Sequence, residues 1–129
     1  MEHQDNISVQ DKYAPNSICF GCGPANEKGL QIKSFRTENG LKMEFETKDE
    51  HQAFPGIING GIISTLLDCH GNWAATMALM EHSQDEFPPC TVTSTFSLKL
   101  KRPTPLHSKL EITAIESDLY DERANVKMT

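Results

Sequence analysis

Residues 60–81 constrain the fold of this chain more than any other segment, because only they have the periodicity of a long helix. The apolar residues at helical spacing form one broad arc, which comprises Ile62, Ile63, Leu66, Leu67, Trp73, Ala74 and Met77. The opposite arc is small and weakly polar, and its one charge is Asp68. A solvent-facing arc would carry several Lys and Glu residues. We therefore expect another surface to approach this one closely.

Most of the other periodic segments alternate as half-buried strands do. They are residues 30–36, 41–47, 91–101, 109–116 and 123–128. Asn39-Gly40 lies between the first two and predicts a hairpin, because both residues tolerate positive φ. Pro103 and Pro105 are expected to end the long strand 91–101. One apolar helix among antiparallel strands predicts an α+β fold in which the sheet wraps around the helix.

Size and charge limit the function classes. The chain has 129 residues, a net charge of −6 and a pI of about 5.3, which predicts one domain and excludes a general nucleic-acid binder. No apolar run approaches the roughly 18 residues of a membrane span, and residues 1–10 lack the apolar core of a secretory signal. We therefore expect a cytoplasmic protein with no membrane partner, a polar leader over residues 1–16 and one domain over 17–129.

Three segments carry a family resemblance. Residues 54–68, FPGIINGGIISTLLD, resemble the central signature of hotdog-fold acyl-CoA thioesterases, in which an acidic residue follows eight positions after the first glycine of the helix. Residues 19–26, CFGCGPAN, with Gly29-Leu30, resemble the leader of the phenylacetyl-CoA-type branch. Residues 100–103, LKRP, match the long strand of that branch. The resemblance implies the hotdog fold, an antiparallel sheet wrapped around one long helix.

The resemblance also implies a function and an assembly. The reaction would be hydrolysis of an acyl-CoA thioester to a free acid and CoA, with no cofactor. The chain would form a homodimer or homotetramer, with the site between the helix of one subunit and the strands of its partner. Two positions depart from the family pattern: Asn59 stands where His is usual, and Ala53 stands where Asn is frequent, so that Gln52 or His51 would have to replace it.

Gly60, Asp68 and Asn59 are the predicted catalytic residues. Gly60 and Gly61 begin the helix, where unpaired N–H groups and the positive end of the dipole can bind a carbonyl oxygen. Asp68 can act as general base on water or as nucleophile, and the sequence leaves both roles open. The competing interpretations are a packing role for the glycines and a structural ion pair for Asp68. Asn59 is expected to cap the helix or to orient substrate.

Substrate binding is predicted for Gly61, Gln52, Thr93, Lys101 and Arg102. Thr93 aligns with a Ser or Thr that positions water in some relatives, although an ordinary outward-facing Thr is the alternative. Lys101 and Arg102 belong to the densest basic region of this acidic chain, which also contains Lys99, His107 and Lys109. The phosphates of CoA would bind there, and a solvated strand end is the alternative.

No metal is predicted. Cys19 and Cys22 have the spacing of half a zinc site, but the sequence offers no second close pair. Cys69 and His70 are adjacent on the helix and point in different directions. His70 falls on the apolar arc, so we expect it to be a hydrogen-bonded core residue.

Two other functions are compatible with the same fold. One is a non-catalytic acyl-CoA-binding module. The other is an enoyl-CoA hydratase or dehydratase, which would need an Asp and a His acting together. Asp68 and His70 point about 160° apart on a helix of roughly 3.6 residues per turn, which counts against this second function.

Overall fold

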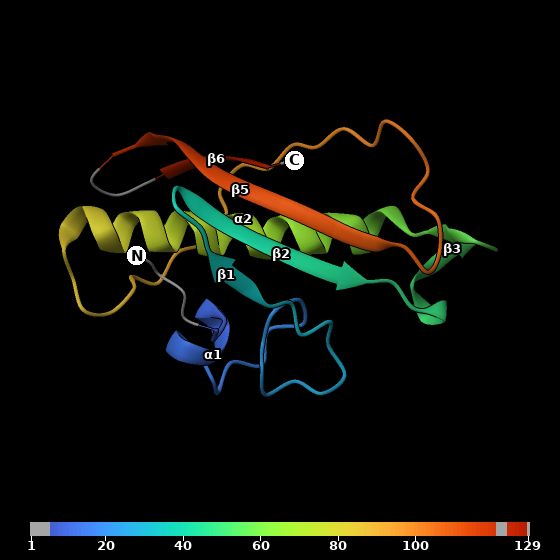
Figure 1. Cartoon of the computed structure of the whole chain (residues 1–129), viewed down its shortest axis with the longest axis horizontal. Helices are drawn as coiled ribbons and strands as arrows, with labels where there is room; N and C mark the ends of the chain where they lie inside the picture. Colours follow the sequence, from blue (N-terminus) through green and yellow to red (C-terminus); the bar gives the residue numbers. More distant parts are fainter. Residues whose placement is uncertain (1–5, 121–123, 129) are drawn as a thin grey trace.

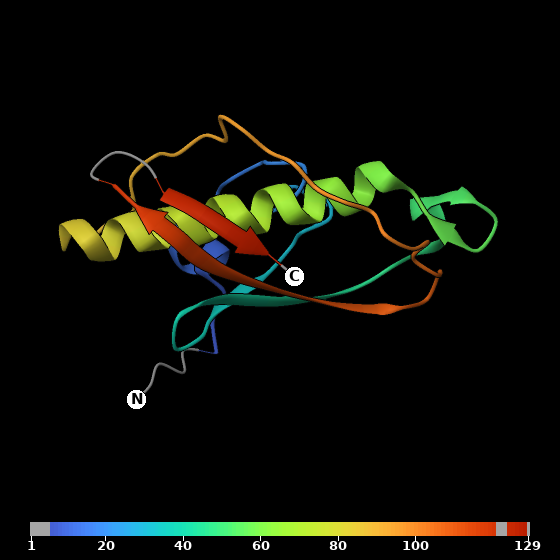
Figure 2. The same ribbon diagram turned by 90° about the horizontal axis from the view of Figure 1, so that it is seen from above.

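The computed structural model describes residues 6–120 and 124–128. One antiparallel sheet has the order β1-β2-β5-β6 and is built from β1 (Ser34–Arg36), β2 (Gly40–Glu46), β5 (Lys109–Leu119) and β6 (Ala124–Met128). The long helix α2 (Gly60–Ser83) crosses one face of this sheet, as Figures 1 and 2 show. The predicted α+β architecture, a sheet around one helix, is confirmed.

The hairpin between β1 and β2 forms where Asn39-Gly40 predicted it, with Arg36 opposite Leu41. The reason given for it is wrong, because neither Asn39 nor Gly40 has positive φ. Gly40 is required for a different contact. A Cβ atom there would lie 1.9 Å from the carbonyl oxygen of Ala114 on β5, so only glycine lets the two backbones approach this closely.

The core lies between α2 and the sheet. Leu66, Ala74 and Met77 of the predicted apolar arc are buried, and they pack with sheet residues that include Leu41, Met43, Ile112 and Ala114. Close approach to the small-residue arc is also confirmed, since the side chain of Met128 on β6 lies over Gly71. A Cβ atom at position 71 would come within 2.7 Å of Met128 Cε. The absence of a side chain at Gly71 therefore lets the end of the Met128 side chain lie against the helix.

The long strand expected at residues 91–101 is not formed. This segment runs back along α2, from the end of the helix toward its start (Figure 2), but it has no strand partner among the residues that the structure describes. A strand requires a neighbouring backbone to which it can donate and accept hydrogen bonds. Alternation of side chains predicted that this segment is extended, but it could not predict whether another backbone segment lies beside it.

The remaining elements are short. The helix α1 (Val9–Tyr13) packs on β1. A 3₁₀ turn (Asp49–His51) leads into β3 (Gln52–Phe54) and β4 (Ile57–Ile58), which pair with each other directly before α2 in the chain. The leader expected at 1–16 is described from residue 6 onward, and within it Val9 and Gln10 are buried. The boundary between leader and domain stays a prediction. Within the described residues, no helix is both long enough and apolar enough to span a bilayer.

Candidate active site

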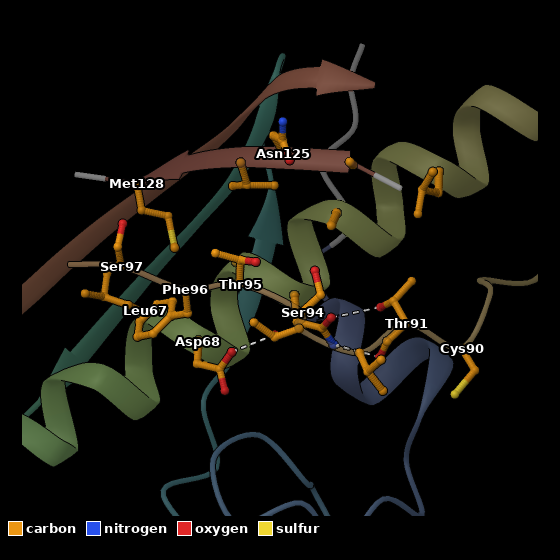
Figure 3. A pocket seen from close by; sticks show the side chains of 18 residues that line it. Leu67, Asp68, Cys90, Thr91, Ser94, Thr95, Phe96, Ser97, Asn125 and Met128 are labelled. Atoms are coloured by element: carbon orange, nitrogen blue, oxygen red, sulfur yellow. Dashed lines mark hydrogen bonds between the residues drawn. The ribbon is translucent and has the colours of Figure 1, made fainter. Parts of the chain in front are cut away.

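Asp68 lies on the side of α2 that faces the unpaired segment 91–101. Thr93 donates a hydrogen bond from Oγ1 to Asp68 Oδ1 over 2.7 Å (Figure 3). One turn further along the helix, Asn72 accepts a hydrogen bond of 2.9 Å from the hydroxyl of Thr91. Thr76, one more turn along, shares a hydrogen bond with the same hydroxyl. The helix therefore holds the segment through side chains at i, i+4 and i+8, which share one face.

The sequence named Asp68 and Thr93 but did not identify Asn72, Thr76 or Thr91. Spacing alone gave a signal for Asn72 and Thr76, since residues 68, 72 and 76 form one stripe on a helix. The partner of that stripe lies 15 to 25 residues away in sequence. No local pattern could predict that partner.

An open cavity of about 630 Å³ adjoins Asp68. Its floor is the stripe side of α2, and its two walls are residues 90–97 and β6 (Figure 3). Leu67, Val92 and Phe96 contribute apolar surface, while Asn72 and Thr95 contribute polar groups. The cavity therefore offers both kinds of contact beside a carboxylate.

The start of α2 is capped by Asn59, whose side-chain oxygen accepts a hydrogen bond of 2.6 Å from the N–H of Gly61. The capping role expected of Asn59 is therefore confirmed. This bond occupies the Gly61 N–H, whereas the Gly60 N–H has no partner among the described residues. Of the two glycines, Gly60 is the one whose N–H is available to a carbonyl oxygen.

Leu100 lies beside that N-terminus. A Cβ atom on Gly60 would lie 3.2 Å from Leu100 Cδ1, so the segment 91–101 reaches from the stripe to the first residue of the helix. Gly60 and Asp68 are eight residues apart, which corresponds to about 12 Å along a helix axis. One carbonyl group cannot contact both of these residues on the same helix.

Gln52 uses its side chain within its own loop. Its Oε1 accepts from the N–H of Gly56 over 2.6 Å, and its Nε2 donates to the carbonyl of Asp49 over 2.9 Å. Both ends of the amide therefore hold the β3–β4 turn in shape. His51, the other residue that could replace the Asn frequent in the family at position 53, is buried. Its ring nitrogen accepts a hydrogen bond from the N–H of Lys48.

Four residues of the basic region divide into two groups. His107 lies 3.6 Å from Asp49, and Lys109 lies 3.3 Å from Glu44, so both face an acidic partner. Lys101 and Arg102 are exposed and form no ion pair with any residue in the described ranges. No carboxylate of the described residues therefore pairs with them, and their binding of CoA phosphates stays a prediction.

Comparisons with known proteins agree with this architecture. A solved structure, described as a thioesterase superfamily protein from Shewanella loihica PV-4, is similar to this chain at 27% sequence identity and a TM-score of 0.67. The match covers 81% of this chain and 83% of the other. The fold is the hotdog fold of the thioesterase superfamily. No family model matches the sequence, and no curated protein does.

Thioesterase-type chemistry is therefore the function class that this similarity supports. The assignment to the phenylacetyl-CoA-type branch stays a prediction.

His70 lies inside the hotdog core, as the sequence predicted. It is fully buried, with Nδ1 2.7 Å from the hydroxyl of Ser34 and Nε2 3.3 Å from the carbonyl of Leu41. Gln10 in turn donates to Ser34 over 3.0 Å. Burial lowers the pKa of His70 to about 4, against the opposing effect of backbone hydrogen bonds with Leu41 and Ile112. His70 is therefore neutral and structural.

Three cysteines meet beside the hotdog helix. Cys19 and Cys22 come from the loop before β1, and Cys69 comes from α2 next to Asp68. Their Sγ atoms all lie within 4.8 Å of one another. A hydrogen bond from Cys69 is the main reason that the pKa of Cys22 falls to about 6, and the same contact raises the pKa of Cys69. The sequence argument against a metal considered Cys69 only together with His70 and did not foresee that it lies beside Cys19 and Cys22.

Proposed function

We propose that the chain is an acyl-CoA thioesterase in which Asp68 activates the attack on the thioester. The observation that carries this proposal is the Asp68–Thr93 pair at the edge of the cavity. Thr93 donates to one carboxylate oxygen, while the other, Oδ2, accepts no hydrogen bond from the described residues. An oriented carboxylate with one free oxygen is suited to take a proton from water or to attack the carbonyl carbon itself.

Gly60 supplies the second half of the chemistry in this proposal. Its free N–H, at the positive end of the α2 dipole, would stabilise the negative charge that develops on the thioester oxygen. Because Gly60 lies about 12 Å along the axis from Asp68 of the same helix, it would act with Asp68 of a second copy. A two-fold dimer would then contain two equivalent sites, each sharing residues from both chains.

The exposed apolar residues of segment 91–101 support such a dimer. Val92 is 86% exposed, Leu100 is 56% exposed and Phe96 is 38% exposed. Their even spacing puts them on one side of an extended chain, and within the described ranges the backbone of the segment has no strand partner. A second copy could cover these side chains and pair with this backbone. Such a dimer would remove both the exposed apolar surface and the unpaired backbone groups.

The substrate would bind with its acyl group toward the cavity and its phosphates toward Lys101 and Arg102. These two residues keep their charge free of acidic neighbours in the described ranges, and they follow directly after Leu100, which lies beside Gly60. The pantetheine arm, which separates the phosphates of a CoA ester from its thioester, would run from these two residues toward the Gly60 N–H.

A thiol-release assay with CoA esters of short, medium, long and aromatic acyl groups tests the proposal. Turnover of at least one ester class is the expected result. Tight binding of CoA esters without thiol release would instead identify a binding module. Hydration of an enoyl-CoA is not expected, because the ring of His70 is buried and both of its nitrogens are engaged.

Mixing two inactive variants tests the shared site. Gly60→Val places a branched side chain against Leu100 and the oxyanion position, and Asp68→Asn removes the carboxylate charge. If each site uses Gly60 of one chain and Asp68 of the other, subunit exchange in an equal mixture should restore about a quarter of wild-type turnover. No recovery, with mixed dimers verified by mass, would contradict the shared site.

A further inference from the structure

The loop that carries Cys19 and Cys22 is built to lie against α2. Gly21, between the two cysteines, has no room for a side chain, since a Cβ atom there would lie 2.3 Å from Cys69 Sγ and 2.9 Å from Thr65 Cγ2. Glycine at this position is therefore what lets the loop bring its two thiols to the third one on the helix. Cys19 in the loop and Cys69 on the helix, whose thiols are in contact, are 50 residues apart in sequence.

Hydrogen bonds within the loop fix its shape before any ligand binds. The N–H of Gly23 donates to the carbonyl of Cys19 over 2.8 Å, which closes the turn that contains both cysteines. Leu30 and Ile32 donate to the carbonyls of Phe20 and Gly21 over 2.8 and 3.0 Å. The thiols are thus held by a backbone framework, and their clustering does not depend on flexible side chains alone.

The spacing of the three sulfur atoms matches that of thiolates around one metal ion. Zinc–sulfur bonds of about 2.3 Å in tetrahedral geometry put neighbouring sulfurs about 3.8 Å apart. Cys19 Sγ and Cys69 Sγ are 3.8 Å apart, and no pair in the cluster exceeds 4.8 Å. Closing the widest pair would require a movement of at most about 1 Å.

We propose that Cys19, Cys22 and Cys69 form a binding site for Zn²⁺, which fastens the loop to α2 beside Asp68. The ion would replace the protons of the three thiols, which pass to solvent, and a water molecule would take the fourth position. No fourth His, Cys, Asp or Glu joins the cluster within the described ranges. Cys19 is exposed, so solvent can reach that position. This inference does not depend on the proposed thioesterase activity.

Titration of the reduced full-length protein with Zn²⁺, against a chromophoric chelator, tests the site. We expect one Zn²⁺ per chain and a higher melting temperature with the ion bound, since a ligand that binds the folded state stabilises it. Co²⁺ used as a probe should give the intense absorption of thiolate-to-metal charge transfer. A wild-type protein that binds much less than one Zn²⁺ per chain would overturn the proposal.

Cysteine variants distinguish this cluster from chance thiol binding. Cys19→Ser, Cys22→Ser and Cys69→Ser should each weaken Zn²⁺ binding by at least about a hundredfold, because a direct ligand matters no less than the groups that orient one. Cys90→Ser is the matched control, because Cys90 is an exposed free thiol outside the cluster; it should bind like wild type.

Gly21→Ala tests the approach of the loop without removing a thiol. It should also weaken binding, because its Cβ atom would push the loop away from Cys69. Circular dichroism of each metal-free variant checks that it is folded. Unchanged affinity in a folded Cys69→Ser protein would show that the helix thiol is not a ligand, and the site as proposed would be wrong.

Discussion

The two sides of α2 use polar residues for opposite purposes. On the side that faces the sheet, His70 is fully buried and joins Ser34 and Leu41 through hydrogen bonds. On the side that faces segment 91–101, Asp68 is only partly buried, and one of its two oxygens bonds to Thr93. A buried polar group must be satisfied for the fold to be stable. A partly open group with spare bonding capacity can act on a ligand.

This difference predicts that substitutions on the two sides separate activity from stability. Changes on the open side should lower turnover in a protein that stays folded. Changes on the sheet side should lower the free energy of unfolding, while the folded molecules keep their turnover. The predictions for Asp68 and His70 below each test one side, and the last one tests the start of the helix.

The largest effect is expected for Asp68→Asn. It keeps the shape of the side chain but removes the charge, so kcat should fall by about a hundredfold or more, as when a positioned acid–base group is lost. The free energy of unfolding should change by less than about 1 kcal/mol, the usual range for a partly exposed side chain. Measuring kcat, CoA-ester binding and oligomeric state on one preparation checks both statements.

Thr93→Val is the matched control for Asp68→Asn, since it removes the hydrogen bond to Asp68 and leaves the carboxylate in place. Its kcat should fall less than that of Asp68→Asn. A folded, correctly assembled Asp68→Asn protein with wild-type turnover would mean that Asp68 only holds the segment 91–101 on the helix.

On the sheet side, His70→Leu should cost about 2 to 3 kcal/mol of unfolding free energy at pH 7, because it leaves the hydroxyl of Ser34 and the carbonyl of Leu41 without this partner. Urea denaturation measures this loss. The kcat of the folded fraction should stay within about twofold of wild type, because the ring has no part in the proposed chemistry. A hundredfold loss of kcat with full stability would reverse the assignment of the two sides.

The same histidine predicts a pH dependence of stability. Its pKa is about 4 in the folded protein, whereas the ordinary pKa of histidine is 6.5. Between these values the unfolded chain binds a proton that the folded chain does not, so stability rises with pH. The stability that neutral His70 contributes is fully present above pH 6.5 and is lost as the pH falls toward 4. The free energy of unfolding should fall by about 2 kcal/mol between pH 7 and pH 5. Denaturation at both pH values should reveal this difference in wild type, and His70→Leu should lack it.

The smallest effect is expected for Asn59→Ala at the start of the helix. Losing the cap on Gly61 should cost about 1 kcal/mol of unfolding free energy. Because the proposed oxyanion donor is Gly60, kcat should change less than it does in Gly60→Val. If Asn59→Ala loses as much turnover as Gly60→Val at full stability, Asn59 has a role in substrate orientation beyond capping.

Local sequence patterns were enough for most of the framework. The period of residues 60–81 predicted α2, and Asn39-Gly40 predicted the β1–β2 hairpin, because both depend on residues close together in the chain. The resemblance of residues 54–68 gave the hotdog fold and selected Gly60 and Asp68. The open side of the helix was also visible in advance, as an arc of small residues around one carboxylate.

The sequence by itself thus determined the long helix, the β1–β2 hairpin and the helix residues that are candidates for chemistry, since periodicity and capping act over a few residues. Tertiary structure decided the rest. It left 91–101 without a strand partner in the described part of the chain and joined Thr93 to Asp68. It also engaged the amide of Gln52 in its own turn and brought Cys69 to Cys19 and Cys22. Except for the Gln52 turn, these outcomes depend on contacts between residues far apart in the chain. Such contacts are fixed by how the elements pack, and no local pattern encodes them.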